Sequence, residues 1–359
     1  MLNNLLAQTR IQTIVEEAQP LLQRDGGLWG NRIPDQDATD LEIIGRDSNL
    51  VTAADLIMDD ATAPLRNEPA LDLVQHKVAN LKRHTALKQE ELALLDRIVN
   101  GGGMVSDITS FDSFLARRVT NALRSVKILR GILCAGMVVD SLVWNKLGLN
   151  LNLTFGAHAA LKVTPAVLWS TAATATPVSD IHSLNVIASD SYGAPKNRVT
   201  MSRASYNFML ATTEYQDKAK GSAGMYLNAN LPVNNDPRSA QLASAVLGMV
   251  VEIDDSQYRL EANDGTVSTA RYVAANKVLL TSTEDDNDAG VWNFGNAIIM
   301  ESIADVNRTI FGGAVRGPVG YSAPANGQLN PPQIAIFAVQ RGMARKMDRG
   351  ASAILTVSA

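Results

Sequence analysis

The chain has 359 residues, of which 46% are hydrophobic and 19% are charged. This balance predicts a folded protein with one large core or two smaller ones and excludes an intrinsically disordered chain. The single cysteine, Cys134, excludes an intrachain disulfide bond. The sequence also lacks a secretory signal and a membrane-spanning apolar run, so we expect a soluble protein made in the cytoplasm.

Charge is distributed unevenly along the chain. Residues 1–76 contain five arginines, no lysine and 13 acidic residues, whereas residues 77–133 contain ten basic and five acidic residues. Such blocks are often solvated surfaces, but they also suit contact between an acidic arm and a basic body, within one chain or between copies. We therefore expect the two segments to attract each other.

The chain begins with an arm and an extended segment. Residues 1–24 show the periodicity of a short amphipathic helix that Pro20 interrupts. Residues 39–86 alternate short strand-like runs with turn-forming residues, and these runs contain too few apolar residues to form a core. We predict a long β-hairpin that lies on something else, followed by a helix from about residue 88 to residue 99.

The clearest pattern lies between residues 110 and 140. Apolar residues recur there at alternating spacings of four and three without an intervening proline, which predicts one long helix with an apolar stripe. Arg117, Arg124 and Lys127 fall on a different face of this helix. Taken alone, this basic face is most simply a solvated surface.

The remainder of the chain predicts alternating strands and helices, and hence the α+β class. A helix should begin at Pro177, with Ser179 or Asp180 as its cap, and another should begin after Ser202, which caps it. Residues 246–260 and 270–282 each predict a pair of strands. Further strands are expected at residues 149–153, 160–163, 198–201, 334–339 and 354–357.

No catalytic or metal-binding pattern stands out. The four histidines are scattered, and the glycines at residues 312–317 do not form a phosphate-binding loop because Pro318 occupies the position of its lysine. The acidic run at residues 284–288 lacks the ligand spacing of a calcium loop and predicts a solvated turn. We therefore expect no cofactor, no metal and no enzymatic activity.

The order of the segments, more than any single motif, resembles a known family. The acidic arm, the hairpin, the long helix carrying Arg117-Arg118 and the strands at residues 149–163 resemble the arm, extended loop, spine helix and peripheral strands of tailed-phage major capsid proteins. The stretch from Asp180 to Ser202 resembles the axial domain of those proteins. The ending, from Pro331 to Val357, is similar to the close of the lambda-like major capsid protein E family.

This resemblance implies the Hong Kong 97-like fold. The expected parts are an N-terminal arm (1–38), an extended β-hairpin loop (39–86), connecting and spine helices (87–142), peripheral domain strands (143–176 and 333–359) and an axial domain (177–332). The extended loop would contact a neighbouring subunit through Ile43, Ile44, Arg46, Leu50, Val51, Leu56 and Arg66. The spine helix would lie toward the inside of the shell, so Arg117, Arg124 and Lys127 would face packaged DNA unless they pair with the acidic arm.

The resemblance also implies function. The chain would be a major capsid protein that assembles with itself into hexamers and pentamers and forms the icosahedral head of a virion around double-stranded DNA. Scaffolding, portal and decoration proteins would be further partners, no membrane would be involved, and assembly would take place in the cytoplasm of the bacterial host. Two alternatives stay open: an encapsulin-like nanocompartment shell that encloses protein cargo, and an enzyme with an unrecognised site.

A covalent link between subunits is not expected. Some members of this fold join a lysine of the extended loop to an asparagine of a neighbouring subunit. The first lysine of this chain is Lys77, at or beyond the base of the loop, so the resemblance implies noncovalent shells.

Overall fold

The fold was determined from a computed structural model of the chain. The residues that it describes are 8–18, 25–38, 44–46, 71–73, 79–86, 89–100, 105–146, 149–222, 237–261, 266–297, 299, 318–324 and 334–358.

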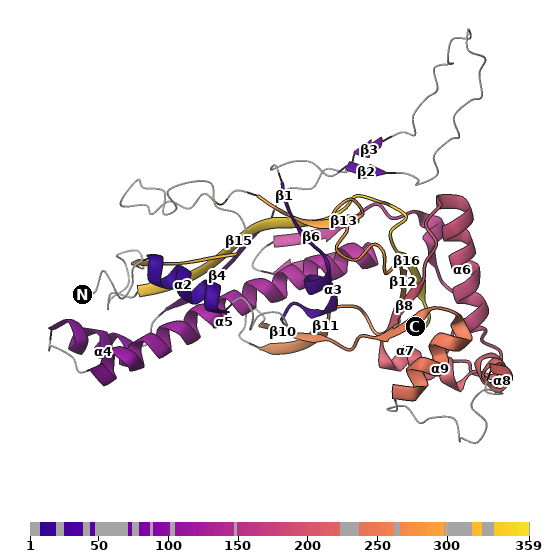
Figure 1. Cartoon of the computed structure of the whole chain (residues 1–359), viewed down its shortest axis with the longest axis horizontal. Helices are drawn as coiled ribbons and strands as arrows, with labels where there is room; N and C mark the ends of the chain where they lie inside the picture. Colours follow the sequence, from indigo (N-terminus) through magenta and orange to yellow (C-terminus); the bar gives the residue numbers. More distant parts are fainter. Residues whose placement is uncertain are drawn as a thin grey trace, which may run out of the picture.

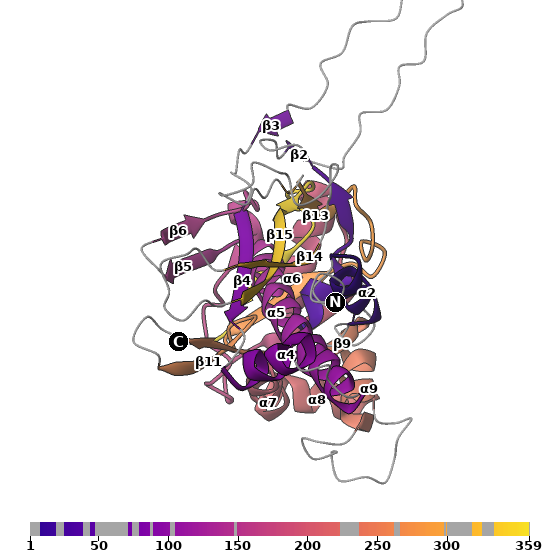
Figure 2. The ribbon, with the colours of Figure 1, turned by 90° about the vertical axis from the view of Figure 1, so that its left-hand side faces the viewer.

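A long helix and a five-stranded sheet form one half of the molecule (Figure 1). The helix α5 (Val105–Val139) packs along the central strand of the sheet, β15 (Ile334–Lys346). In the view of Figure 2, α5 and α4 (Gln89–Asn100) lie on one face of the strands. The other strands are β4 (Ala79–Ala86), β13 (Trp292–Asn296) and β14 (Val319–Pro324), which pair antiparallel with β15, and β1 (Asp35–Asp37), which pairs parallel with β13.

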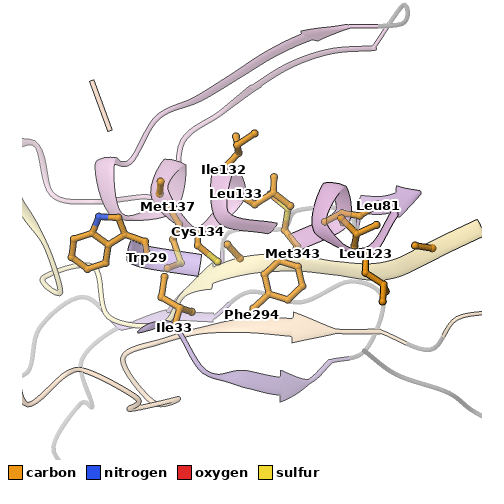
Figure 3. Packing of buried hydrophobic residues seen from close by; sticks show 14 of the residues in the cluster. Trp29, Ile33, Leu81, Leu123, Ile132, Leu133, Cys134, Met137, Phe294 and Met343 are labelled. Atoms are coloured by element: carbon orange, nitrogen blue, oxygen red, sulfur yellow. The ribbon is translucent and has the colours of Figure 1, made fainter. Parts of the chain in front are cut away.

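Burial of its apolar stripe explains the length of α5. Leu115, Val119 and Val126 face the core, and from Gly131 to Val138 every residue of the helix is buried. Its 35 residues span about 52 Å at 1.5 Å per residue. The predicted long helix is therefore confirmed, although it begins five residues before the expected start. Figure 3 shows the core around it. Trp29 of the short helix α3 (Gly27–Arg32) and the following Ile33 belong to this core, together with Leu81 of β4, Phe294 of β13 and Met343 of β15.

A second sheet and four helices form the other half. Its two faces cover two different hydrophobic cores, and the register of the strands decides which side chains point to each core. Val199 and Leu280 point to a second hydrophobic cluster under the helices, whereas Leu279 and Ile354 point to the first cluster, so the sheet lies between the two cores. In spatial order its strands are β7 (Lys162–Val163), β16 (Ala353–Thr356), β12 (Lys277–Thr281), β8 (Arg198–Met201) and β9 (Val250–Ile253); the helices are α6 (Pro177–Tyr192), α7 (Arg203–Ala211), α8 (Thr213–Ser222) and α9 (Pro237–Leu247).

Short elements complete the described chain. Helix α2 (Gln8–Ala18) packs against α5 and β14, and the six-residue helix α3 (Gly27–Arg32) lies on α5. Three two-stranded ladders are formed by β2 (Ile44–Arg46) with β3 (Leu71–Leu73), β5 (Leu142–Lys146) with β6 (Leu149–Leu153), and β10 (Gln257–Glu261) with β11 (Val267–Arg271). A 3₁₀ turn, η2 (Ala159–Leu161), precedes β7.

The α+β class is confirmed, but two predicted strand pairings are wrong. Residues 246–260 do not form a hairpin, because α9 continues to Leu247, β9 pairs parallel with β8, and β10 pairs with β11. Residues 270–282 likewise divide between β11 and β12, and β12 pairs with β8 and β16. Strand propensity located these strands, but partners distant in sequence determined how they pair.

The expected cap of α6 is also wrong, whereas that of α7 is confirmed. Pro177 occupies the first turn of α6, and the N–H groups of Val178 and Ser179 donate to the carboxylate of Glu214, a residue of α8. In α7 the Oγ of Ser202 accepts a hydrogen bond from the N–H of Ser205 at 3.1 Å. A cap within the same segment follows from sequence, but one supplied by another helix does not.

Sheet membership does not follow the boundaries that the resemblance implied. β16 lies within residues 333–359, which were assigned to peripheral strands, yet it pairs with β12 of the segment assigned to the axial domain. Conversely, β13 and β14 fall within residues 177–332 but pair with β15. The chain crosses between the two sheets several times, so no single boundary in sequence separates them.

Candidate functional site

The extended-loop segment is anchored at both ends in one sheet. β1 precedes it, and its last eight residues form β4, so this part of the predicted hairpin is instead a strand of the first sheet. Register places Asp37, Asn296, Gly342 and Ala79 side by side in a row across four strands. With strands about 4.8 Å apart, the two ends of the segment leave the sheet roughly 14 Å from each other. Gly342 is required in this row because a Cβ there would lie 2.3 Å from the ring of Phe294.

Buried polar groups hold β1 in its register. The Asn296 side chain donates to Asp35 Oδ1 and accepts from Gln340 Nε2, each at 2.9 Å. Arg130 of α5 donates to Asp35 Oδ2 and to the carbonyl oxygen of Ile33, again at 2.9 Å. Asn296 and Arg130 are buried, so a shift of β1 by one residue would take Asp35 away from both and leave their donor groups without this partner, which is costly in the interior.

The loop residues named from sequence fall mostly outside the described part of the chain. Ile44 and Arg46 lie in β2, where they pair with Leu73 and Leu71 of β3, so the predicted hairpin has an antiparallel ladder at this point. Ile43, Leu50, Val51, Leu56 and Arg66 lie outside the described residues, as does Lys77.

The three basic residues of the spine helix have different surroundings. Arg124 forms a bidentate ion pair with Asp25, at 2.9 and 3.2 Å. Lys127 is half-buried beside Gly26. Its pKa is lowered, most strongly by burial and next by the charge of the nearby Arg130. Arg117 is exposed, and the described residues offer it no ion-pair partner. The expected attraction between the acidic arm and the basic helix is thus confirmed within one chain, through Arg124 with Asp25 and Arg130 with Asp35.

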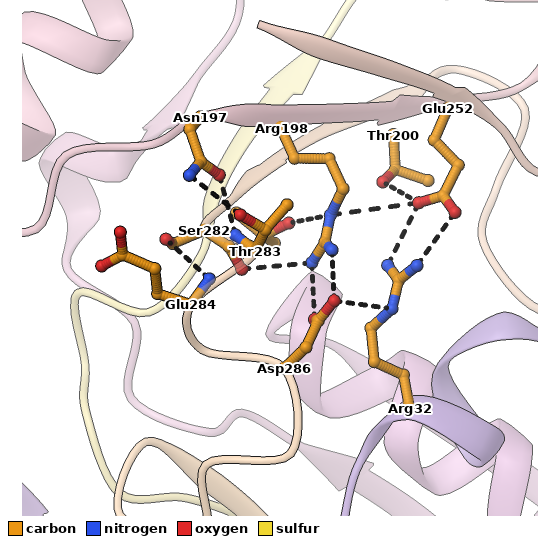
Figure 4. A network of polar contacts seen from close by, with 10 residues as sticks. Arg32, Asn197, Arg198, Thr200, Glu252, Ser282, Thr283, Glu284 and Asp286 are labelled. Atoms are coloured by element: carbon orange, nitrogen blue, oxygen red, sulfur yellow. Dashed lines mark hydrogen bonds and ion pairs between the residues drawn. The ribbon is translucent and has the colours of Figure 1, made fainter.

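A charged network that was not predicted from sequence joins α3 to the second sheet (Figure 4). Arg32 binds both carboxylate oxygens of Glu252, at 3.1 and 2.9 Å, and its Nε lies 3.4 Å from Asp286. Arg198, which is 3% exposed, donates to both oxygens of Asp286, at 2.5 and 2.8 Å, and to the hydroxyl of Thr281. The alternation of polar and apolar residues in 198–201 was the one sequence signal for this polar face.

The acidic run at residues 284–288 is not simply a solvated turn, so that prediction is wrong for two of its residues. Asp286 neutralises the buried Arg198, and Asp285 lies 4.0 Å from the buried Lys196. Partial burial raises the pKa of Asp285 to about 6, although the charge of Lys196 opposes this shift. The run supplies counter-charges for buried cations, a role that requires partners about 90 residues away in the chain.

The described part of the chain holds neither a candidate metal centre nor a membrane-spanning helix. No group of three or more histidine, cysteine or acidic side chains there could hold a metal ion. Within the same residues, no helix is long and apolar enough to cross a membrane. Cys134 is buried in the first core, where burial raises the pKa of its thiol to about 11.

Comparisons with known proteins agree with this architecture. The family model described as phage major capsid protein E matches residues 19–295. The structure is similar to that of the putative capsid protein of a prophage of E. coli CFT073, with 10% identity over 98% of this chain and 99% of the other and a TM-score of 0.57. It is also similar to a phage-related protein of Bordetella bronchiseptica RB50, with 14% identity, 96% of each chain covered and a TM-score of 0.50. No curated protein matches the chain in sequence.

These findings confirm the Hong Kong 97-like fold that the order of segments implied. The family match spans well over half of the chain. The protein therefore belongs to the phage major capsid protein E family, as a structural, capsid-forming protein and not an enzyme.

Proposed function

We propose that copies of this chain assemble into hexamers and pentamers that form the icosahedral head of a phage around double-stranded DNA. The family match over residues 19–295 carries the proposal. Assembly takes place in the cytoplasm of the bacterial host and yields the shell of the virion. Scaffolding, portal and decoration proteins are further proposed partners, and the helices and sheet of the second core form the axial domain around each symmetry axis.

Electron microscopy of the protein expressed alone, and of particles from infected cells, tests this proposal. The expected result is closed shells with hexameric and pentameric units, and DNA in the particles from infected cells. Small oligomers alone would contradict the proposal, and shells filled with protein cargo would favour a nanocompartment instead.

We further propose that the extended-loop segment lies across a neighbouring subunit. The two sheet strands β1 and β4 fix both ends of this segment, while the described ladder within it, β2 with β3, is only three residues long. A two-stranded ladder of this size is not stable alone, so its stabilisation must come from other contacts.

Replacing residues 47–70 with Asn-Gly tests the role of the loop. This turn suits the register of Arg46 opposite Leu71, so the subunit should fold as before but fail to form closed shells. The matched control replaces residues 262–266, between the paired Glu261 of β10 and Val267 of β11, with the same dipeptide, and should assemble normally. Normal shells from the first variant would show that the loop does not join subunits.

For DNA contact, Arg117 is the favoured residue of the basic helix, because Arg124 is paired with Asp25 and Lys127 is half-buried. The contact would be to phosphates, weak for each subunit and independent of sequence. Arg117→Gln should leave empty shells intact and lower the thermal stability of filled heads. Arg124→Gln should instead loosen the N-terminal segment in both kinds of particle. If Arg117→Gln heads retain DNA as stably as the wild type, this arginine is merely solvated.

A further inference from the structure

One face of the second sheet is unusually polar for a surface between two cores. Register places Thr200 between Leu279 and Glu252, and Arg198 opposite Thr281, all on the face that points to the first core. The opposite face carries apolar residues packed under the helices. Arg198 and Thr200 are 3% and 2% exposed, so something other than water covers the polar face.

The cover is the N-terminal segment of residues 25–38, which we call the latch. Arg32 binds Glu252 and Asp286, and the Trp29 ring lies under the guanidinium groups of Arg32 and Arg198, at 5.1 and 5.9 Å. Trp29 is 1% exposed and packs edge-on against Trp292 of the first sheet, with ring centroids 5.9 Å apart. The latch therefore touches both halves of the molecule.

The two sides of the latch are held by different forces. Toward α5 its backbone approaches so closely that a Cβ on Gly131 would lie 1.9 Å from the Gly26 carbonyl oxygen, and Ile33 is buried in the first core. β1 also pairs with β13. Apolar burial and sheet hydrogen bonds make this side a permanent part of the first core.

Toward the second sheet, the contacts of Arg32 are ionic, while Leu279 and Ile354 of that sheet pack in the first core. Arg32 and Glu252 retain 15% and 29% side-chain exposure, so water can reach them when they part. An ion pair adds little net stability once desolvation is counted, but it specifies one geometry. When this contact separates, the charged groups that it exposes are well solvated by water. When an apolar contact separates, the exposed groups are poorly solvated.

We propose that the latch is a releasable clamp: fixed on the first core, it holds the second sheet in one orientation through Arg32, and breaking the contacts of Arg32 lets the two halves turn against each other. The inference goes beyond capsid assembly and does not depend on the proposed hexamers, pentamers or DNA. It predicts that the orientation of the two halves, rather than the integrity of either, depends on Arg32.

Spin-label distance measurements between the two halves test the latch. Cysteines introduced at the exposed Asn121 of α5 and Ser183 of α6 carry the labels, while the native Cys134 is fully buried and stays unlabelled. Labelled chains are diluted with unlabelled ones so that only distances within a subunit are measured. The wild type should give one narrow distance distribution, and Arg32→Gln should add a second population.

Matched variants separate a latch from general loosening. Arg203→Gln removes a more exposed ion pair, with Asp255 at 3.3 Å, that does not involve the latch, and should leave the distribution narrow. Glu252→Gln removes the charge of one of the two carboxylates that bind Arg32 and should reproduce the second population. This variant keeps the proposal testable if Arg32→Gln fails to fold. An unchanged distribution in both latch variants, or equal broadening in Arg203→Gln, would overturn the proposal. Electron microscopy of the same samples reports assembly separately.

Discussion

Lys346 offers a quantitative test of the interior electrostatics. Its side chain is 1% exposed at the end of β15, and its Nζ donates to Ser352 Oγ at 2.7 Å. Ser352 Oγ in turn donates to the carbonyl oxygen of Val138, near the end of α5, at 2.7 Å. Burial lowers the pKa of Lys346 from 10.5 to about 8, with Asp140 and Asp348 opposing the shift and Lys196 and Lys162 adding to it.

This shift has a definite sign for stability. The folded protein binds the proton of Lys346 more weakly than the unfolded chain does, so the charged lysine destabilises the fold below pH 8. At about 1.4 kcal/mol per pKa unit, the penalty is about 3 kcal/mol. It is relieved as the pH rises from about 8 to 10.5, where the unfolded chain also loses the proton.

The substitution Lys346→Met removes the charge while keeping an unbranched chain of similar length. It also loses the hydrogen bond to Ser352, which costs about 1 kcal/mol. The variant should therefore be more stable than the wild type by roughly 2 kcal/mol at pH 7, from a penalty of about 3 kcal/mol less that loss. This advantage should disappear by pH 10.5.

Guanidinium unfolding of dissociated subunits at pH 7 and pH 10.5, followed by tryptophan fluorescence, measures both differences. Lys220→Met, at a position where the lysine is 69% exposed beside Asp217, is the control and should show no pH-dependent advantage. If Lys346→Met were destabilising by a similar amount at both pH values, pairing of Lys346 with Asp140 and Asp348 would outweigh its burial, and the reasoning would be refuted.

Three further predictions concern the spine and the subunit contacts. Phe111→Ala should cost about 3–5 kcal/mol of unfolding free energy because the ring is fully buried. Phe114→Ala, on the exposed side of the same helix, should cost less than about 1 kcal/mol. Equal losses of unfolding free energy in guanidinium would contradict the assignment of the two helix faces. Gly131→Ala would force its Cβ against Gly26, so we expect a loss of at least about 2 kcal/mol, and a wild-type melting temperature would count against the close approach. Shells boiled with reductant should give one gel band near 38.5 kDa because the first lysine is Lys77, and a ladder of larger bands would show covalent links.

Local patterns in the sequence predicted the helices and strands well where the deciding forces are local. The stripe from Leu115 to Val126 predicted α5 because one helix face packs on one sheet. Ser202 was correctly predicted as a cap because its partner, the N–H of Ser205, is three residues away. The same reasoning failed for α6, where the partner is Glu214 of another helix.

The candidate site shows the same division. The charge imbalance between residues 1–76 and 77–133 correctly predicted that the arm and the spine helix meet, since net charge acts over long distances. It did not predict that Arg32 would bind Glu252 of the second sheet, 220 residues away in the chain, and not the spine helix. Nor did it show that Asp285 and Asp286 would turn inward to buried cations.

The sequence by itself therefore determined the folded α+β class, the long helix, some of the strands and, through the order of the segments, the capsid family, whereas β13 and β14 were not predicted. Only the tertiary structure decided which strands pair, which charges are buried, and that one N-terminal segment covers the polar face of the second sheet. The physical reason is range: periodicity and capping act within a few residues, whereas strand register and ion pairing depend on groups that folding brings together from distant parts of the chain.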